Sequence, residues 1–145
     1  MNLLPLFESF ETSFIGGTIR GSQWLFPVIE SIHLVALAVI GGAVLVLDLR
    51  LFGFGLRDQP VRQVARDTQP WLVASLLAMI ATGVPLFLSE SVKCYYSQAF
   101  WVKMTALLAA IVYTFTVRRS VAMAEETRVW RGAHKLIGFA SLLLW

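Results

Sequence analysis

Three ionisable side chains lie inside stretches of the sequence that are otherwise apolar, and their types suit chemistry. Glu30 and His33 lie in the first long apolar stretch, and Lys103 lies near the start of a later one. An ionisable side chain is costly in hydrocarbon, so it usually faces a partner or a cavity and marks a functional site. Glu30, His33 and Lys103 are therefore the candidate site residues.

Glu30 and His33 are three residues apart, which places both side chains on one face of a helix. His33 follows Trp24 by nine residues, a depth of roughly 13 Å along a helix. A neutral imidazole is a good iron ligand, and an acceptor at its other ring nitrogen would fix its tautomer. Glu30 is a candidate for that acceptor or for a proton-carrying group. Alternatively, the pair only holds helices together through polar contacts.

Lys103 and His134 each have two interpretations. The stem of Lys103 can snorkel to the lipid headgroups, or it can point toward the depth of His33 and meet a carboxylate, a heme propionate or the iron. His134 lies beside Lys135, more than half a bilayer from His33 in the expected arrangement. Two axial ligands of one heme must lie at similar depth, so we expect His134 to be hydrated at the interface.

The composition is that of a membrane protein. The chain is 57% hydrophobic and only 14% charged, whereas soluble domains carry about 25% charged residues. Its basic residues lie between apolar stretches and are not gathered on one polar face, which argues against nucleic acid as a partner. The single cysteine, Cys94, cannot form an intrachain disulfide or a Cys-rich metal site.

Four apolar segments predict an all-α fold, an integral membrane four-helix bundle over residues 23–145. The expected spans are about 24–47, 70–88, 99–117 and 133–145. A helix must be about 30 Å long to cross the hydrocarbon core of a membrane. The polar cluster Asp48-Leu49-Arg50 is expected to end the first span, and Pro70 suits the start of the second. The fourth reaches only about 20 Å, so either it is a half-span or, as we expect, the helix continues beyond the last residue.

Residues 1–22 predict a short amphipathic helix that lies in the membrane interface. Its apolar side chains recur at spacings of three and four, and Gly16-Gly17 is expected to break it. No cleavable signal peptide is evident, because the first 20 residues lack a basic start and a clean apolar core.

Basic residues predict the orientation. Nine Lys and Arg residues lie in the connections after the first and third spans, against three on the other side. The positive-inside rule then places both basic connections in the cytoplasm and the N-terminus outside, in a bacterial cytoplasmic (inner) membrane. Aromatic residues mark the outer interface: Trp24, Phe26, Tyr95, Tyr96, Phe100 and Trp101.

Several short motifs resemble a known group of membrane proteins. The first span carries Trp24, Pro27, Glu30 and His33 at regular spacing and leaves through Arg50-Leu51-Phe52, and the third opens with Trp101-Val102-Lys103-Met104. This order resembles the HemJ-type protoporphyrinogen oxidases and the copper-resistance D-like proteins, and most closely a group of short bacterial membrane proteins. The resemblance covers residues 24–120 and implies a four-helix bundle with heme b bound through His33 and with Lys103 near the site. Because Glu30 and Asp48-Leu49-Arg50 depart from the oxidase pattern, oxidase activity is not implied.

Three functions follow as expectations. The first is a b-type heme protein for electron transfer, with His33 as metal ligand and with Glu30 and Lys103 beside the cofactor, as a membrane subunit of a larger oxidoreductase. The second is a non-catalytic accessory subunit that stabilises a membrane complex, and the third is a proton or copper conduit. The small buried surface of four short helices is compatible with association with itself or with other membrane or periplasmic redox subunits.

Overall fold

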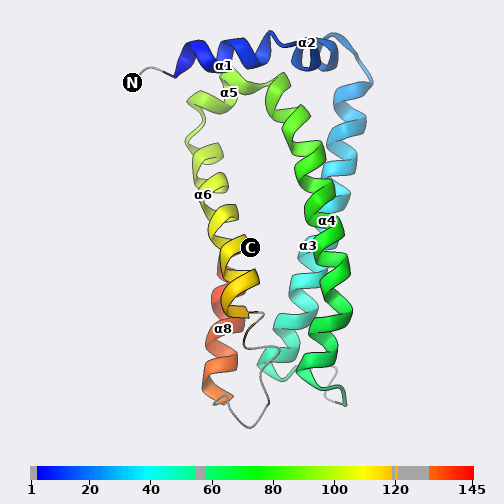
Figure 1. Cartoon of the computed structure of the whole chain (residues 1–145), viewed down its shortest axis with the longest axis vertical. Coiled ribbons are helices and arrows are strands. Elements are labelled where there is room, and N and C mark those ends of the chain that lie inside the picture. Colours follow the sequence, from blue (N-terminus) through cyan, green and yellow to red (C-terminus); the bar gives the residue numbers. More distant parts are fainter. Residues whose placement is uncertain (1–2, 55–57, 119, 121–130) are drawn as a thin grey trace. The chain divides into compact units, whose positions relative to one another are not determined.

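All regular structure in the described part of the chain is helical, which confirms the all-α class. The computed structural model describes residues 3–54, 58–118, 120 and 131–145, and the side chains of all of these except 118 and 131–134. The helices are α1 (Leu4–Glu11), α2 (Phe14–Gly21), α3 (Leu25–Phe52), α4 (Val61–Ser89), α5 (Ser91–Tyr96), α6 (Gln98–Tyr113), the π-helix η1 (Thr114–Arg118) and α8 (Arg131–Leu144) (Figure 1).

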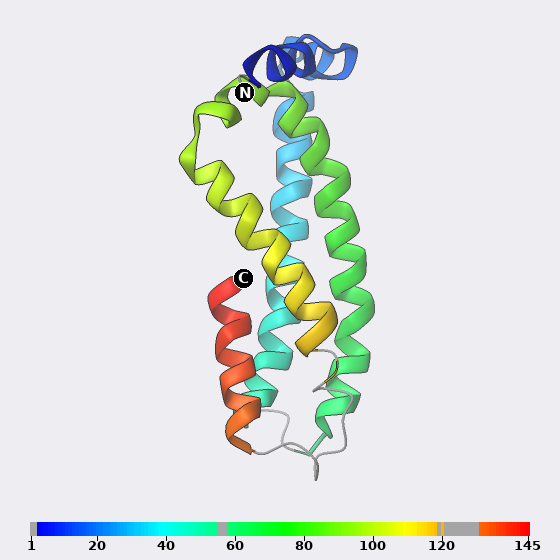
Figure 2. The ribbon, with the colours of Figure 1, turned by 60° about the vertical axis from the view of Figure 1, so that its left-hand side comes forward.

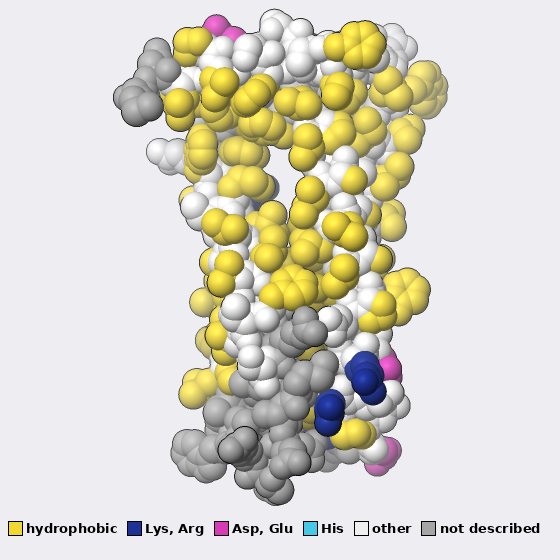
Figure 3. All heavy atoms as spheres, in the orientation of Figure 1, with side chains coloured by type: hydrophobic (Ala, Val, Ile, Leu, Met, Phe, Trp, Pro, Cys, Tyr) yellow, Lys and Arg dark blue, Asp and Glu magenta, His cyan; other side chains and the backbone are white. Residues whose placement is uncertain are grey.

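Three helices are long and apolar enough to cross a membrane by length and composition. They are α3, α4 and the stretch Gln98–Val117, which is α6 and most of η1. Many of their large apolar side chains are exposed, and hydrophobic side chains cover much of the face seen in Figure 3. A surface of this kind suits contact with lipid. The fourth expected span is represented by α8, whose 14 residues are shorter than a full crossing.

Two span boundaries differ from the expected ones, because packing extends the helices. The helix of the first span, α3, continues to Phe52, so Asp48 lies inside it rather than beyond its end. The helix of the second span, α4, begins at Val61, directly after Pro60, and runs through Pro70. Its first turns bury Val61, Val64 and Ala65 on one face, which stabilises helix in a segment whose other residues are polar.

The N-terminal segment forms two helices instead of one. The break lies at Thr12–Ser13, before the glycine pair that was expected to cause it. The hydroxyl of Ser13 accepts a hydrogen bond from the Gly16 backbone N–H at 3.2 Å and so caps the start of α2. Gly16 and Gly17 are therefore helical residues of α2, and the capping serine decides where the chain turns.

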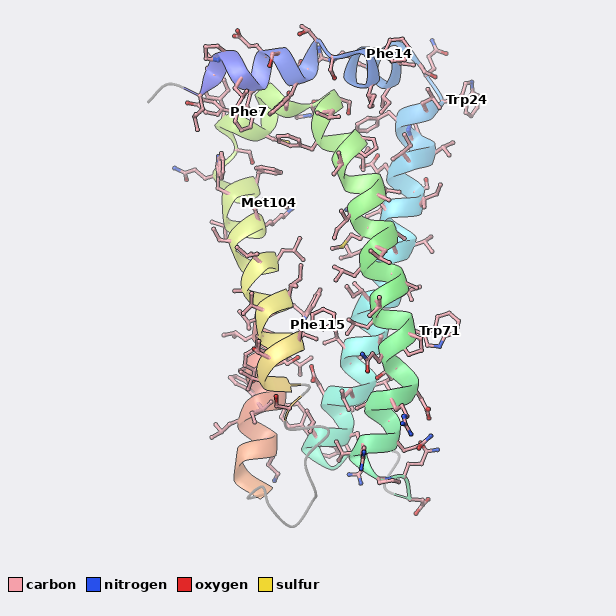
Figure 4. All side chains as sticks on the ribbon, in the orientation of Figure 1. Phe7, Phe14, Trp24, Trp71, Met104 and Phe115 are labelled. Carbon is pink, nitrogen blue, oxygen red and sulfur yellow. The ribbon has the colours of Figure 1, made fainter. Side chains whose placement is uncertain are left out.

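The chain divides into two compact units, described here separately. The first, residues 1–38 and 75–103, holds α1, α2, α5, the adjoining parts of α3 and α4, and the start of α6. In it, α1 and α2 lie across the ends of α3, α4 and α5 (Figures 1 and 2). Phe7 points from α1 toward α5 (Figure 4), and its ring lies 5.1–6.2 Å from four other rings: Phe10, Phe87, Tyr95 and Trp101.

The second unit, residues 39–74 and 104–145, has its own apolar core. Leu47, Leu51, Val61, Val64 and Ala65 form this core, and Ile137 of α8 packs against it. Two hydrogen bonds join α8 to the third span: the Tyr113 hydroxyl donates to the Ile137 carbonyl at 2.9 Å, and the Trp145 indole donates to Thr114 Oγ1 at 3.0 Å. These contacts hold the short helix in place.

Candidate functional site

His33 is the one candidate residue that the structure engages with another span. Its side chain is half-buried on α3, and its Nδ1 lies 2.9 Å from Oγ1 of Thr82 on α4. Both residues belong to the first unit. The partner is 49 residues away in the sequence, and no local motif pointed to it.

The hydrogen bonds of Thr82 assign the tautomer of His33. The hydroxyl of Thr82 has a single hydrogen, and it donates this hydrogen to the Ala78 carbonyl at 2.7 Å. With this hydrogen donated to Ala78, Thr82 accepts from His33, an arrangement that corresponds to the tautomer with the imidazole proton on Nδ1. Nε2 then carries the lone pair. A neutral histidine held through Nδ1–H with its Nε2 available is the form that binds a metal.

Gly83 lets the imidazole lie close to α4. A Cβ atom at this position would come within 3.2 Å of His33 Cε1 and 3.7 Å of Nδ1. The first distance is tighter than ordinary contact, so an alanine would push the ring away from the helix. Thr82 and Gly83 thus hold the same ring through a hydrogen bond and a close packing contact.

Glu30 and Lys103 lie in the same unit as His33, and both side chains are exposed. The hydrogen-bond partner of His33 Nδ1 is Thr82 and not Glu30, which the sequence had suggested for this role. The acidic residue one turn before His33 is therefore not needed to orient the ring. Lys103 lies in the second turn of α6, a position compatible with a headgroup contact.

The first unit also contains an opening. In the space-filling view an opening lies beneath α1 and α5, with α4 on one side and the start of α6 on the other (Figure 3). The phenyl ring of Phe87 in α4 stacks on that of Phe100 in α6, with centroids 5.6 Å apart and planes at 14°.

The donor set favours iron in a macrocycle over a bare metal ion. Among the described residues no group of three or more His, Cys, Asp or Glu side chains could hold a metal ion. Structural and catalytic zinc sites use three or four protein ligands. A heme iron brings four ring nitrogens of its own and needs only one or two side chains. A single histidine is therefore compatible with heme ligation.

Asp48 is a buried acid that the sequence interpretation treated as the end of a span. Its side chain is fully buried inside α3, in the second unit. The signal was present in the spacing, because Asp48 follows the buried residues Ile40 and Val44 at intervals of four. It therefore continues the buried face of the helix. An acid in such a position is usually functional or paired.

His134 remains untested as an interfacial residue, because its side chain lies outside the described residues. The same is true of most of the basic connection before α8, including Arg119 and Arg128.

Comparison with known proteins gives one family match. The chain matches DUF6644, described as a family of unknown function, over residues 6–145. No curated protein and no solved structure matches the chain.

Proposed function

The chain belongs to the DUF6644 family, and we propose that it is a b-type heme protein that carries electrons in a membrane, with His33 as an axial ligand. We further propose four spans with the N-terminus outside, in a bacterial cytoplasmic membrane. Redox subunits of the membrane or periplasm would be its partners.

The observation that carries this proposal is the hydrogen-bonded state of His33. Thr82 fixes the ring through Nδ1–H and leaves the Nε2 lone pair available. Gly83 supports the proposal as well, because it leaves room for the imidazole close to α4. In this proposal the heme lies in the opening between α4 and the start of α6 (Figure 3).

Each residue of the site has a defined task in this proposal. His33 binds the iron, Thr82 sets the basicity and orientation of the imidazole, and Gly83 permits its close approach to α4. Bound heme supplies one-electron chemistry, and its potential depends on ligand basicity and burial. Lys103 has a charge that suits either a headgroup or a propionate, and Glu30 lies at the periphery.

A visible spectrum of the purified protein tests the proposal. Wild type should show a Soret band and a sharp α-band after reduction, with about one heme per chain by pyridine hemochromogen assay. His33→Ala should lose both bands, whereas Glu30→Gln should keep them, because the glutamate is exposed and does not hold the ring. A folded but colourless wild type would contradict the proposal and favour an accessory subunit.

A further inference from the structure

We infer that α1 and α2 form a lid that separates the His33 site from the outer aqueous phase, and that Glu11 is the latch of this lid. The inference rests on the proposed function and orientation. Within the first unit, α1 and α2 lie across the ends of α3 and α4 (Figures 1 and 2), and the opening seen in Figure 3 lies beneath α1 and α5.

Glu11 joins three helices. Its Oε2 accepts a hydrogen bond from the backbone N–H of Val92 in α5 at 2.9 Å, and its Oε1 pairs with Arg20 of α2. The Glu11 side chain is only 13% exposed, which limits solvent screening of its contact with Val92, whereas the Arg20 side chain is 52% exposed and its pairing is partly screened. Neutralising the carboxylate would weaken the α1–α5 and α1–α2 contacts at once.

Other contacts also attach α1 to α5. The buried hydroxyl of Ser91 donates to the Phe7 carbonyl at 2.7 Å, and the Phe7 ring packs on Tyr95. The lid joins α3 through only three non-helical residues, 22–24, and Ser22 there has an extended backbone (φ −103°, ψ 126°). A short non-helical connection of this kind can act as a hinge when the other contacts are released.

Cys94 gives the lid a natural reporter. It is the only cysteine, and it lies on α5 between Ser91 and Tyr95, two of the residues that contact α1. Cys94 is half-buried, so a membrane-impermeant maleimide should label it slowly with the lid closed and faster as the open population of the lid grows. Loss of a charge-assisted hydrogen bond from Glu11→Gln should raise this rate about tenfold.

Arg20→Gln separates opening of the lid from a charge effect on the thiol. Removing the negative charge of Glu11 would favour the Cys94 thiolate and speed labelling even with the lid closed, whereas removing the positive charge of Arg20 would slow it. Opening predicts that both variants label faster. Glu8→Gln is the matched control, because Glu8 is an exposed acid of the same helix and should label like wild type.

The second measurement is the transfer of heme from the purified protein to apomyoglobin added in the aqueous phase. Glu11→Gln and Arg20→Gln should release heme faster than wild type, in the same order as their labelling rates. Faster labelling in Glu11→Gln together with slower labelling in Arg20→Gln would contradict the role of Glu11 as a latch. Faster labelling without faster heme release would contradict the role of α1 and α2 as a barrier between the His33 site and the aqueous phase. A preparation without heme would contradict the proposed function alone, because Cys94 labelling tests the latch without heme.

Discussion

At the scale of single residues, the sequence identified His33 but could not identify what holds it. An ionisable residue in an apolar stretch is visible in any sequence, because the cost of burying it is general. The partner is Thr82, an ordinary residue of another apolar stretch, and only folding brings the two together. Asp48 was missed for a related reason, because its polar neighbour Arg50 suggested the end of a span.

Thr82→Val tests the orientation of the imidazole. Valine has nearly the same shape as threonine but cannot accept a hydrogen bond, so His33 Nδ1–H would lose its partner. Loss of such a partner lowers the affinity of a metal site about 10- to 100-fold. Heme titration followed by the Soret band measures the change. Thr82→Ser, which keeps the hydroxyl, should bind nearly as tightly as wild type, and equal affinity in the valine variant would contradict the assigned role.

Cys94 should require a higher pH for alkylation than a free cysteine does. Partial burial, and then the negative charge of Glu90, raise the pKa of the Cys94 thiol, while Lys93 opposes them. A raised pKa leaves less thiolate at neutral pH, so the alkylation rate should reach its midpoint at a higher pH than that of a free cysteine. Glu90→Gln should shift this midpoint to lower pH. A profile like that of free cysteine would show that the thiol is not shielded.

At the scale of elements, hydropathy predicted the long helices, and packing decided where they begin and end. The start of α4 lies in a polar stretch that the hydropathy pattern excluded, yet Val61, Val64 and Ala65 bury one face of it. The short helix α5 was not predicted, because its six residues carry no apolar period. Its position depends on contacts from α1, which are made between residues far apart in the sequence.

Two neighbouring glycines of α2 test the docking of the N-terminal helices. A Cβ atom at Gly16 would lie 2.6 Å from the Leu88 carbonyl oxygen, whereas Gly17 has nothing within 4 Å. Gly16→Ala should therefore displace α2 and lower the free energy of unfolding by about 1–3 kcal/mol. Gly17→Ala should be neutral or slightly stabilising, because alanine is the better helix former. Thermal unfolding in one detergent compares the two, and equal stability would contradict the close contact with Leu88.

At the scale of the whole molecule, the composition predicted helices that could cross a membrane, but the sequence pattern did not establish the number of spans. The excess of hydrophobic residues predicted helices able to cross a membrane, and three have the required length and hydropathy. The fourth span stays a prediction, because α8 is short. Its contacts with Tyr113 and Thr114 could not be read from apolar periodicity, since they depend on the fold.

The proposed orientation predicts which cysteines can be labelled from outside the cell. Cys94 should react with an impermeant maleimide in intact spheroplasts at pH high enough to form the thiolate. Asp58→Cys, made together with Cys94→Ser, should react only after permeabilisation, because the exposed residue 58 lies in a basic connection assigned to the cytoplasm. Labelling of position 58 in intact spheroplasts would reverse the assigned orientation.

Ligation of heme iron by His33 Nε2 is the central claim, and a cavity variant tests it most directly. His33→Gly removes the imidazole and leaves Thr82 and the opening of the first unit in place. The measurement is the reduced visible spectrum of this variant, reconstituted with heme, before and during titration with free imidazole. Saturable recovery of the wild-type α-band by imidazole is the predicted result. A spectrum that matches wild type without imidazole would show that another residue binds the iron, and a variant and wild type that both fail to bind heme would end the proposal.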